Sequence, residues 1–487
     1  MYKSIAYFNE FGVKSLEKKV ESFIREGKDI ADLVIGMQED LFQFARNMIA
    51  ETLEGMDDFL REAAFRKIYW NIERRNDIGS ILTSFGTVEY QKTYFKSKTD
   101  NSTKHLIDEL VGITPHDRVS EDVKINAITE AVESSYRKGG TKGSFVESIT
   151  KQTVKNFIHD LEIELPEEKV MEKKVKKILY IEADEDHVSL QFHRTKGDLR
   201  ADTNGYKINT AMPRLVYIHE GIEVEGKDKK RGKLINKHHF GGMYKDVEEL
   251  WNEVAIYIAE NYEEEMIETI YLSGDGAAWI KKGLDFIDKS IFVLDAYHLK
   301  KYIVAATSHI GDSAEDARDE IKDAFSMEDK EALKDTFARL IDAAETDAKK
   351  DNIQKSLTYI RNNWKGIIIK NTKGYEIVGC SAEGHVSHIY SDRMSSRPLG
   401  WVNKGVDHMA RLRIFRENGG NVYDLVMYQK RKKQKEEVRA IQDEIVQEAR
   451  KHAGKYNDGM NVTFSAVENG KKTTLSDALR AMSRRVG

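Results

Sequence analysis

The chain has 487 residues, of which 40% are hydrophobic, and its 77 Lys and Arg nearly balance its 82 Asp and Glu. This length predicts about three domains with packed cores, and the net charge of −5 excludes a uniformly basic nucleic-acid coat and a strongly acidic tail protein. Cys380 is the single cysteine, which excludes an internal disulfide and a cysteine zinc cluster. Because no secretory signal or membrane span is visible, we expect a cytoplasmic protein.

The N-terminal region, residues 1–110, is predicted to be mainly helical with a small β-hairpin. Apolar residues recur at helical spacing between residues 10 and 75, which favours helices that pack on their neighbours. Residues 80–98 are then rich in β-branched and aromatic residues after Gly86, a pattern typical of a strand or hairpin.

Residues 111–165 have the pattern of a DNA-binding helix-turn-helix. A first helix is expected to end at Gly139-Gly140, and a short helix then leads to a break near Ile149. Thr150 is a plausible N-cap for the following helix. In this motif the second helix enters the major groove by its N-terminal residues. Those residues, which suit contacts with phosphates and base edges, are Lys151, Gln152, Lys155 and Asn156. Plain packing of two helices in a bundle is the alternative.

A charged segment that contains Pro166, residues 163–176, is typical of a linker. Beyond it, short apolar runs alternate with helical patterns. Strands are predicted at 177–184, 187–194, 214–223, 233–242, 268–275 and 290–298, and helices at 247–265 and 276–287. This order indicates a mixed sheet with helices on its faces, the α/β class.

Two of these predicted strands end in a carboxylate. Asp184 closes the first strand and Asp275 closes a later one. Because ligands of an open α/β sheet bind beyond the carboxyl ends of strands, the two acids predict a hard-oxygen site for Mg²⁺ or Mn²⁺. Asp186 is a competing ligand, and Asp184 is preferred because it directly ends the apolar run.

The stretch 375–420 adds a third acid and a set of cationic and aromatic side chains. Glu383 is flanked by small residues that would let a bulky substrate approach. The arginines that follow suit bidentate phosphate contacts, and a tryptophan could stack on an unpaired base. These residues are Arg393, Arg397, Trp401, Arg411 and Arg413. Surface ion pairs and a core tryptophan are the alternatives. His385 and His388 permit a zinc site, but the lack of a nearby third ligand disfavours it.

Four motifs in this order carry a resemblance to a known family: YIEADEDHVSLQ, SGDGAAWIKKG, LDAYHLKKY and SAEGHVSHIYSDRMSSRPLGW…MARLR. They resemble the bacterial insertion-sequence transposases of the ISLre-two family, relatives of the Mutator-like DDE transposases. The resemblance implies a ribonuclease H-like core at 177–304 and 370–425, interrupted by a helical insertion at 305–369. It also implies a nucleoid-associated location in the bacterial cytoplasm.

The resemblance further implies a catalytic and metal-binding triad, Asp184, Asp275 and Glu383, with an auxiliary role for Asp295 and His298. Two Mg²⁺ or Mn²⁺ ions would serve the cleavage of a phosphodiester and the transfer of the strand. Asp184 would bridge both ions, while the other two acids would each hold one.

The expected partners are double-stranded DNA, from element ends and target, and a second copy of the chain in a dimer or higher oligomer. The basic, helical segment 426–487 is a further candidate for phosphate contact. Three alternatives remain: a ribonuclease H-like nuclease or resolvase without strand transfer, a catalytically inactive DNA-binding relative, and a two-carboxylate glycosidase. The arginines after Glu383 count against the glycosidase.

Overall fold

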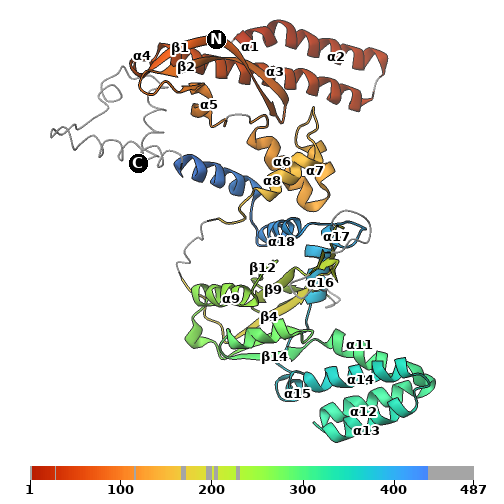
Figure 1. Ribbon diagram of the computed structural model, residues 1–487. Helices are drawn as coiled ribbons and strands as arrows, with labels where there is room; N and C mark the ends of the chain where they lie inside the picture. Colours follow the sequence, from red (N-terminus) through yellow and green to blue (C-terminus); the bar gives the residue numbers. More distant parts are fainter. Residues whose placement is uncertain are drawn as a thin grey trace, which may run out of the picture. The chain divides into compact units, whose positions relative to one another are not determined.

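The computed structural model describes residues 3–27, 29–114, 117–165, 172–192, 200–201, 207–225 and 231–436 (Figure 1). It divides into two compact units. The first unit is formed by Met1–Glu162 with Val422–Gly487, and the second by Ile163–Asn421. Most of the C-terminal segment predicted at 426–487 therefore lies outside the described residues. In the described part of the chain, no helix has both the length and the apolar character needed to cross a bilayer.

The first unit begins with helices that pack on a long β-hairpin. Its elements are α1 (Lys3–Tyr7), η1 (Phe8–Gly12), α2 (Val13–Glu26), α3 (Ile30–Glu62), α4 (Ala64–Tyr69), β1 (Trp70–Thr83), β2 (Gly86–Ser97), β3 (Thr103–Lys104) and α5 (Leu106–Val111). Asp29 caps α3 by accepting a hydrogen bond from the backbone N–H of Ala31. Buried Asp57 of α3 accepts hydrogen bonds from the backbone N–H and hydroxyl of Thr93, which ties the helix to β2. The hairpin is longer than the sequence indicates because β1 begins ten residues before the predicted strand.

Three short helices follow: α6 (Glu121–Glu133), α7 (Tyr136–Lys142) and α8 (Lys151–His159). The expected helix end at Gly139-Gly140 is wrong, because α6 ends at Glu133 and both glycines lie buried inside α7. A Cβ on Gly139 would stand 2.5 Å from the carbonyl oxygen of Ala127, and one on Gly140 would stand 2.3 Å from that of Ile149. The glycines therefore allow close backbone packing rather than a break. The short helix expected before Ile149 is also absent, since residues 143–150 form bends and loop.

A helix over residues 422–436 returns to the first unit after the second is complete. Lys430 places its ammonium 2.7 Å from a carboxylate oxygen of Glu121 at the start of α6. The ammonium of Lys432 lies 2.9 Å from a carboxylate oxygen of Glu162. Val422, Leu425 and Val426 are buried, so the described part of this C-terminal helix belongs to the packed structure.

The second unit is built on a five-stranded mixed sheet in the order β12-β9-β4-β13-β14 (Figure 1). The strands are β4 (Ile178–Glu185), β9 (Arg214–His219), β12 (His238–Gly242), β13 (Thr269–Gly274) and β14 (Ser290–Leu294). β9 is antiparallel to both β4 and β12, whereas β13 and β14 run parallel to β4. The predicted mixed α/β class is therefore confirmed.

Two of the predicted strands differ from the structure. The run 187–194 supplies only β5 (Val188–Ser189), which pairs with β8 (Thr210–Ala211). The run 233–242 is divided between β11 (Arg231–Leu234) and β12, because Asn236 adopts a left-handed φ of 49° that turns the chain. β11 pairs with β10 (Ile222–Glu225), and β6 (Arg200–Ala201) pairs with β7 (Lys207–Ile208).

One face of the sheet carries an apolar core. Leu179, Ile181 and Ala183 alternate along β4 and pack with Trp251 and Val254 of α9 (Val247–Asn261). After β13 the chain forms α10 (Ala278–Lys281) and η3 (Lys282–Asp285), which pack on this core. Together they replace the single helix predicted at 276–287, so the α-helical part is shorter than predicted. The opposite face of β4 carries polar and aromatic residues, and the candidate site is built from them.

A group of helices follows β14 in the chain, and the last of them packs on this strand. They are α11 (Ala296–Thr307), η4 (Ser308–Ser313), α12 (Ala314–Ser326), α13 (Lys330–Asp342), α14 (Asp347–Asn362) and α15 (Trp364–Lys373), and they share one core with Leu294. The chain then forms α16 (Ala382–Val386), η5 (Ser387–Ser391), α17 (Asp392–Met394) and α18 (Asn403–Glu417), of which α18 packs on β12.

Candidate functional site

The strand register aligns three aspartates at one edge of the sheet. Ala183 of β4 is opposite Gly274 of β13, so the next residues, Asp184 and Asp275, follow at the same level of adjacent parallel strands. Leu294 of β14 is also opposite Gly274, and Asp295 follows it. Neighbouring strands lie about 4.8 Å apart. The carboxyl ends of three parallel strands therefore present a row of acids, here called the acid row: Asp184, Asp275 and Asp295.

Electrostatics link this row to the third predicted acid. The pKa of Asp184 is raised to about 7, mainly by burial and also by the negative charges of Asp275 and Glu383, while the backbone hydrogen bond from Glu185 and the charge of His298 oppose the rise. Asp184 Oδ1 accepts a hydrogen bond of 2.9 Å from the backbone N–H of Glu185. Asp275 Oδ1 accepts one of 2.8 Å from that of Ala277. The three predicted catalytic acids are thus close enough for their charges to interact.

Asp295 and His298 form a pair at the start of α11. Asp295 caps this helix, accepting hydrogen bonds from the backbone N–H groups of Tyr297 and His298, and its carboxylate lies 2.8 Å from His298 Nδ1. The hydrogen bond to Asp295 raises the pKa of His298, and the charges of Asp184 and Asp275 contribute to the rise. The imidazole is therefore biased toward its cationic form beside the acid row.

Glu383 is exposed on α16, and buried Glu182 anchors the start of that short helix to β4. Glu182 Oε2 accepts hydrogen bonds from the backbone N–H of Ser381, at 2.5 Å, and from the hydroxyl of Tyr217. Its other oxygen lies 3.0 Å from His219 Nε2. Glu182 is not among the site residues that the sequence predicts. Strand alternation was the available signal, because it places residues two apart on the same face of the sheet.

The chemistry of the aspartates suits a hard divalent cation, since carboxylate oxygens are the ligands such ions prefer. Among the residues that the structure describes, however, no three His, Cys, Asp or Glu side chains are grouped as a metal site. Asp184 and Asp275 supply two donors in register, whereas the exposed side chain of Glu383 is not gathered into a three-ligand group with them.

Asp186, the competing candidate for the first metal ligand, is hydrogen-bonded to a residue outside the acid row. It is buried, and its two carboxylate oxygens accept hydrogen bonds from the hydroxyl of Ser395 at 2.8 and 3.1 Å. The geometry therefore favours Asp184 as the acid that faces the neighbouring strand.

Three residues predicted to contact DNA are parts of the protein interior. Arg393, Trp401 and Arg413 are buried. The Arg393 guanidinium lies over the Trp401 ring at 5.0 Å from its centroid, and Arg413 donates a hydrogen bond of 2.7 Å to the carbonyl of His388. Because a phosphate contact needs an accessible cation and base stacking needs an accessible ring, burial disfavours all three as DNA contacts. Sequence could not separate them from Arg397, which is exposed.

Arg411 is also engaged within the protein. Its Nε lies 3.0 Å from Asp407 Oδ1, and its guanidinium lies over the ring of Tyr244. His385 lies 3.0 Å from His239, whereas the exposed His388 is near Asp392. The two histidines that permitted a zinc site thus have different partners.

In the first unit, α8 has the N-cap that the sequence predicts. The Thr150 hydroxyl accepts a hydrogen bond of 3.1 Å from the backbone N–H of Thr153. Val154 and Ile158 are buried on the inner face. Of the candidate DNA contacts, Lys151, Gln152 and Asn156 are exposed and Lys155 is half-buried.

Residues 23–433 of the chain match the model of the uncharacterised protein family UPF0236. The chain is a member of UPF0236. Relatives occur in Caldanaerobacter subterraneus subsp. tengcongensis. The UPF0236 protein TTE0610/TTE0881/TTE1053/TTE2432 is 39% identical over 472 residues, which are 96% of this chain and 95% of the relative. Another UPF0236 protein, whose name joins eleven locus designations, is 38% identical over 465 residues, covering 95% of this chain and 93% of that protein.

Among solved structures, the Drosophila P element transposase strand transfer complex contains a similar chain. The alignment covers 64% of this UPF0236 chain and 85% of the other, with 10% identity and a TM-score of 0.22. A similarity of this size does not establish a shared fold. The UPF0236 match itself includes the three acids, the Asp295–His298 pair and α8.

Proposed function

We propose that this UPF0236 protein is a DDE transposase, similar to those of the ISLre-two insertion-sequence family, that cleaves DNA at element ends and transfers the strand to target DNA. The observation that carries the proposal is the register of Asp184 and Asp275 at the carboxyl edge of the sheet, with the charge of Glu383 acting on the same group. Ligands of α/β sheets bind at such an edge.

The topology supports a ribonuclease H-like core. Three successive large strands are antiparallel neighbours, and two parallel strands then extend the sheet beside the first of them. Helices α11 to α15 lie between the second and third acids in the sequence, where the family resemblance implies a helical insertion.

Asp184, Asp275 and Glu383 would hold two Mg²⁺ or Mn²⁺ ions, which would supply Lewis-acid stabilisation to the attacking and leaving oxygens of the phosphodiester. The raised pKa of Asp184, which is due first to burial and then to the charges of Asp275 and Glu383, supports this assignment, because a bound cation would favour the ionised carboxylates. Glu182 would position the helix that carries Glu383. His298, held by Asp295, would present a cationic hydrogen-bond donor to a phosphate near the acid row.

Double-stranded DNA is the proposed substrate. The exposed N-terminal side chains of α8 would read it in the major groove, and exposed Arg397 would contact phosphate. A dimer would hold the two ends of an element together. The eleven locus designations of one relative also support a mobile element, since copying within a genome produces repeated loci of this kind.

The test is a cleavage and joining assay on duplex DNA that carries the sequences flanking the gene, with Mg²⁺ present. We expect nicking at the element end and joining to a target duplex. Asp184→Asn, Asp275→Asn and Glu383→Gln should each reduce both products to background while DNA binding persists, and exposed Asp288→Asn should leave both unchanged. Normal cleavage by any one triad variant would remove that acid from the site. Cleavage without joining would favour a nuclease or resolvase.

A further inference from the structure

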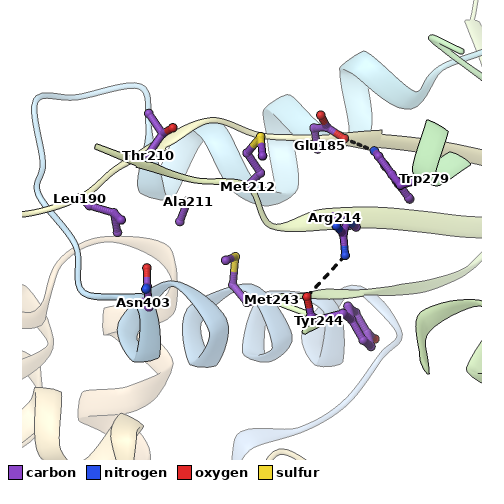
Figure 2. Close-up of a pocket in the computed structure, with 10 residues that line it drawn as sticks. All are labelled: Glu185, Leu190, Thr210, Ala211, Met212, Arg214, Met243, Tyr244, Trp279 and Asn403. Atoms are coloured by element: carbon purple, nitrogen blue, oxygen red, sulfur yellow. Dashed lines mark hydrogen bonds between the residues drawn. The ribbon is translucent and has the colours of Figure 1, made fainter. Parts of the chain in front are cut away.

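A pocket of about 360 Å³ is lined by Glu185, the last residue of β4, and by Arg214 of β9, which is opposite Glu185 in the strand register (Figure 2). Its lining is mainly apolar and aromatic, with a few polar groups. The volume is within the range of small-ligand sites, and this mixture of apolar walls and a few polar groups is typical of them.

The pocket adjoins the proposed catalytic acids through the chain itself. Glu185 directly follows Asp184, and Trp279 lies in α10, the short helix that begins three residues after Asp275. Asp184 and Glu185 are the last two residues of β4, so their side chains flank the carboxyl end of this strand from its two faces.

The pocket wall combines π-surface with groups that can read a polar edge. Figure 2 shows the Trp279 indole donating its N–H to the Glu185 carboxylate and Arg214 reaching toward Tyr244. The Arg214 guanidinium lies over the Trp279 ring at 5.5 Å from its centroid and donates a hydrogen bond of 3.4 Å to the carbonyl of Tyr244. An aromatic and guanidinium wall of this kind stacks well on a planar heteroaromatic ring.

The other side chains that line the pocket also suit a planar heteroaromatic ring. Met212 and Met243 are flexible, polarisable side chains that adapt to rings of different size. Thr210 and Asn403 add a hydroxyl and an amide that can hydrogen-bond to a base edge whichever base is present. An aliphatic ligand would leave these polar groups unused.

We propose that this pocket receives one unpaired nucleobase of the DNA strand, next to the phosphate held at the acid row. The inference rests on the proposed function and adds to it the part of the substrate that is taken out of the duplex. Enzymes that extrude a base bind it between aromatic and apolar side chains and read its edge by hydrogen bonds, which offsets the lost stacking and pairing. The pocket would then fix which phosphate lies over the acids.

The experiment compares two forked DNA duplexes of the same sequence, one with unpaired bases at the junction and one with abasic nucleotides there. All proteins carry Asp275→Asn so that no cleavage occurs. Binding is measured for this background and for Met212→Trp, which fills the pocket from an exposed position, and Trp279→Ala. Tyr375→Ala is the matched control, because it removes an aromatic side chain that is 83% exposed and does not line the pocket.

We expect the background protein and Tyr375→Ala to bind the base-bearing fork about tenfold more tightly than the abasic fork. Met212→Trp and Trp279→Ala should bind both forks equally, with the affinity that the background protein has for the abasic fork. Equal binding of the two forks by the background protein would overturn the base pocket and leave the DNA-binding proposal standing. A tenfold preference that survives in Met212→Trp would place the base elsewhere. Binding of neither fork would instead refute the proposed function on which the pocket rests.

Discussion

Replacing Asp184 by Asn is expected to stabilise the metal-free protein at neutral and higher pH. The pKa of Asp184 rises from its ordinary 3.8 to about 7, first through burial and then through the charges of Asp275 and Glu383. A carboxyl with a higher pKa in the folded state binds its proton more tightly there. Its contribution to stability is therefore fully present below about pH 4, and it is lost as the pH rises to about 7 and the folded protein must carry the charge.

The size of the expected gain in stability follows from the difference between the ordinary pKa of Asp184 and its pKa in the folded protein. At about 1.4 kcal/mol per pH unit, the rise corresponds to roughly 4 kcal/mol, and solvent screening at a half-buried side chain reduces the expected gain to about 2 kcal/mol. Asn removes the charge but keeps an oxygen that can accept the hydrogen bond from the backbone N–H of Glu185.

Urea unfolding at pH 5 and pH 8, with a chelator present, measures this gain. We expect Asp184→Asn to exceed wild type by about 2 kcal/mol at pH 8 and by much less at pH 5. Exposed Asp288→Asn should change neither value. Saturating Mg²⁺ should reduce or reverse the advantage, because it binds the folded wild-type site. A variant that is no more stable than wild type at pH 8, or one with the same difference at both pH values, would refute the electrostatic reasoning.

The other predictions concern DNA binding, the anchor of α16 and the packing of α7. Lys155→Ala should weaken binding of element ends and lower the slope of log affinity against log salt by about 1, whereas an unchanged salt series would reject α8 as the recognition helix. Glu182→Gln should cost about 1–3 kcal/mol of unfolding free energy and reduce cleavage by releasing Ser381, so a variant with wild-type stability and cleavage would show that this anchor is dispensable. Gly140→Ala should destabilise the first unit by about 1–3 kcal/mol because its Cβ would meet a backbone oxygen, while Gly55→Ala, in the open interior of α3, should be neutral or stabilising in the same thermal melt.

The sequence was most informative where local chemistry and topology agree. Asp184 and Asp275 each follow an apolar strand, and their separation of 91 residues equals the register offset between β4 and β13. The ends of these two strands could be predicted because each apolar run stops at an acid. The register between the strands could not be predicted, because it depends on how two strands far apart in the sequence pack against one core.

Sequence was least informative about burial. Arg393 and Arg413 have the residue type of a phosphate ligand, but their surroundings come from distant segments and place them inside the protein. Gly139 and Gly140 show the same limit, since a helix-ending signal and a close-packing site use the same residue. Glu182 is a further case: its function as an anchor depends on Ser381, which lies 199 residues away.

The return of the chain over residues 422–436 has a consequence for the order of synthesis. The partner of Glu121 is Lys430, so the first unit cannot complete this contact until the whole second unit has left the ribosome. A product that stops before residue 422 would contain every acid of the proposed catalytic centre but would lack the helix that closes the unit bearing α8. Premature termination would thus leave the proposed catalytic centre without a complete first unit, the unit proposed to recognise DNA.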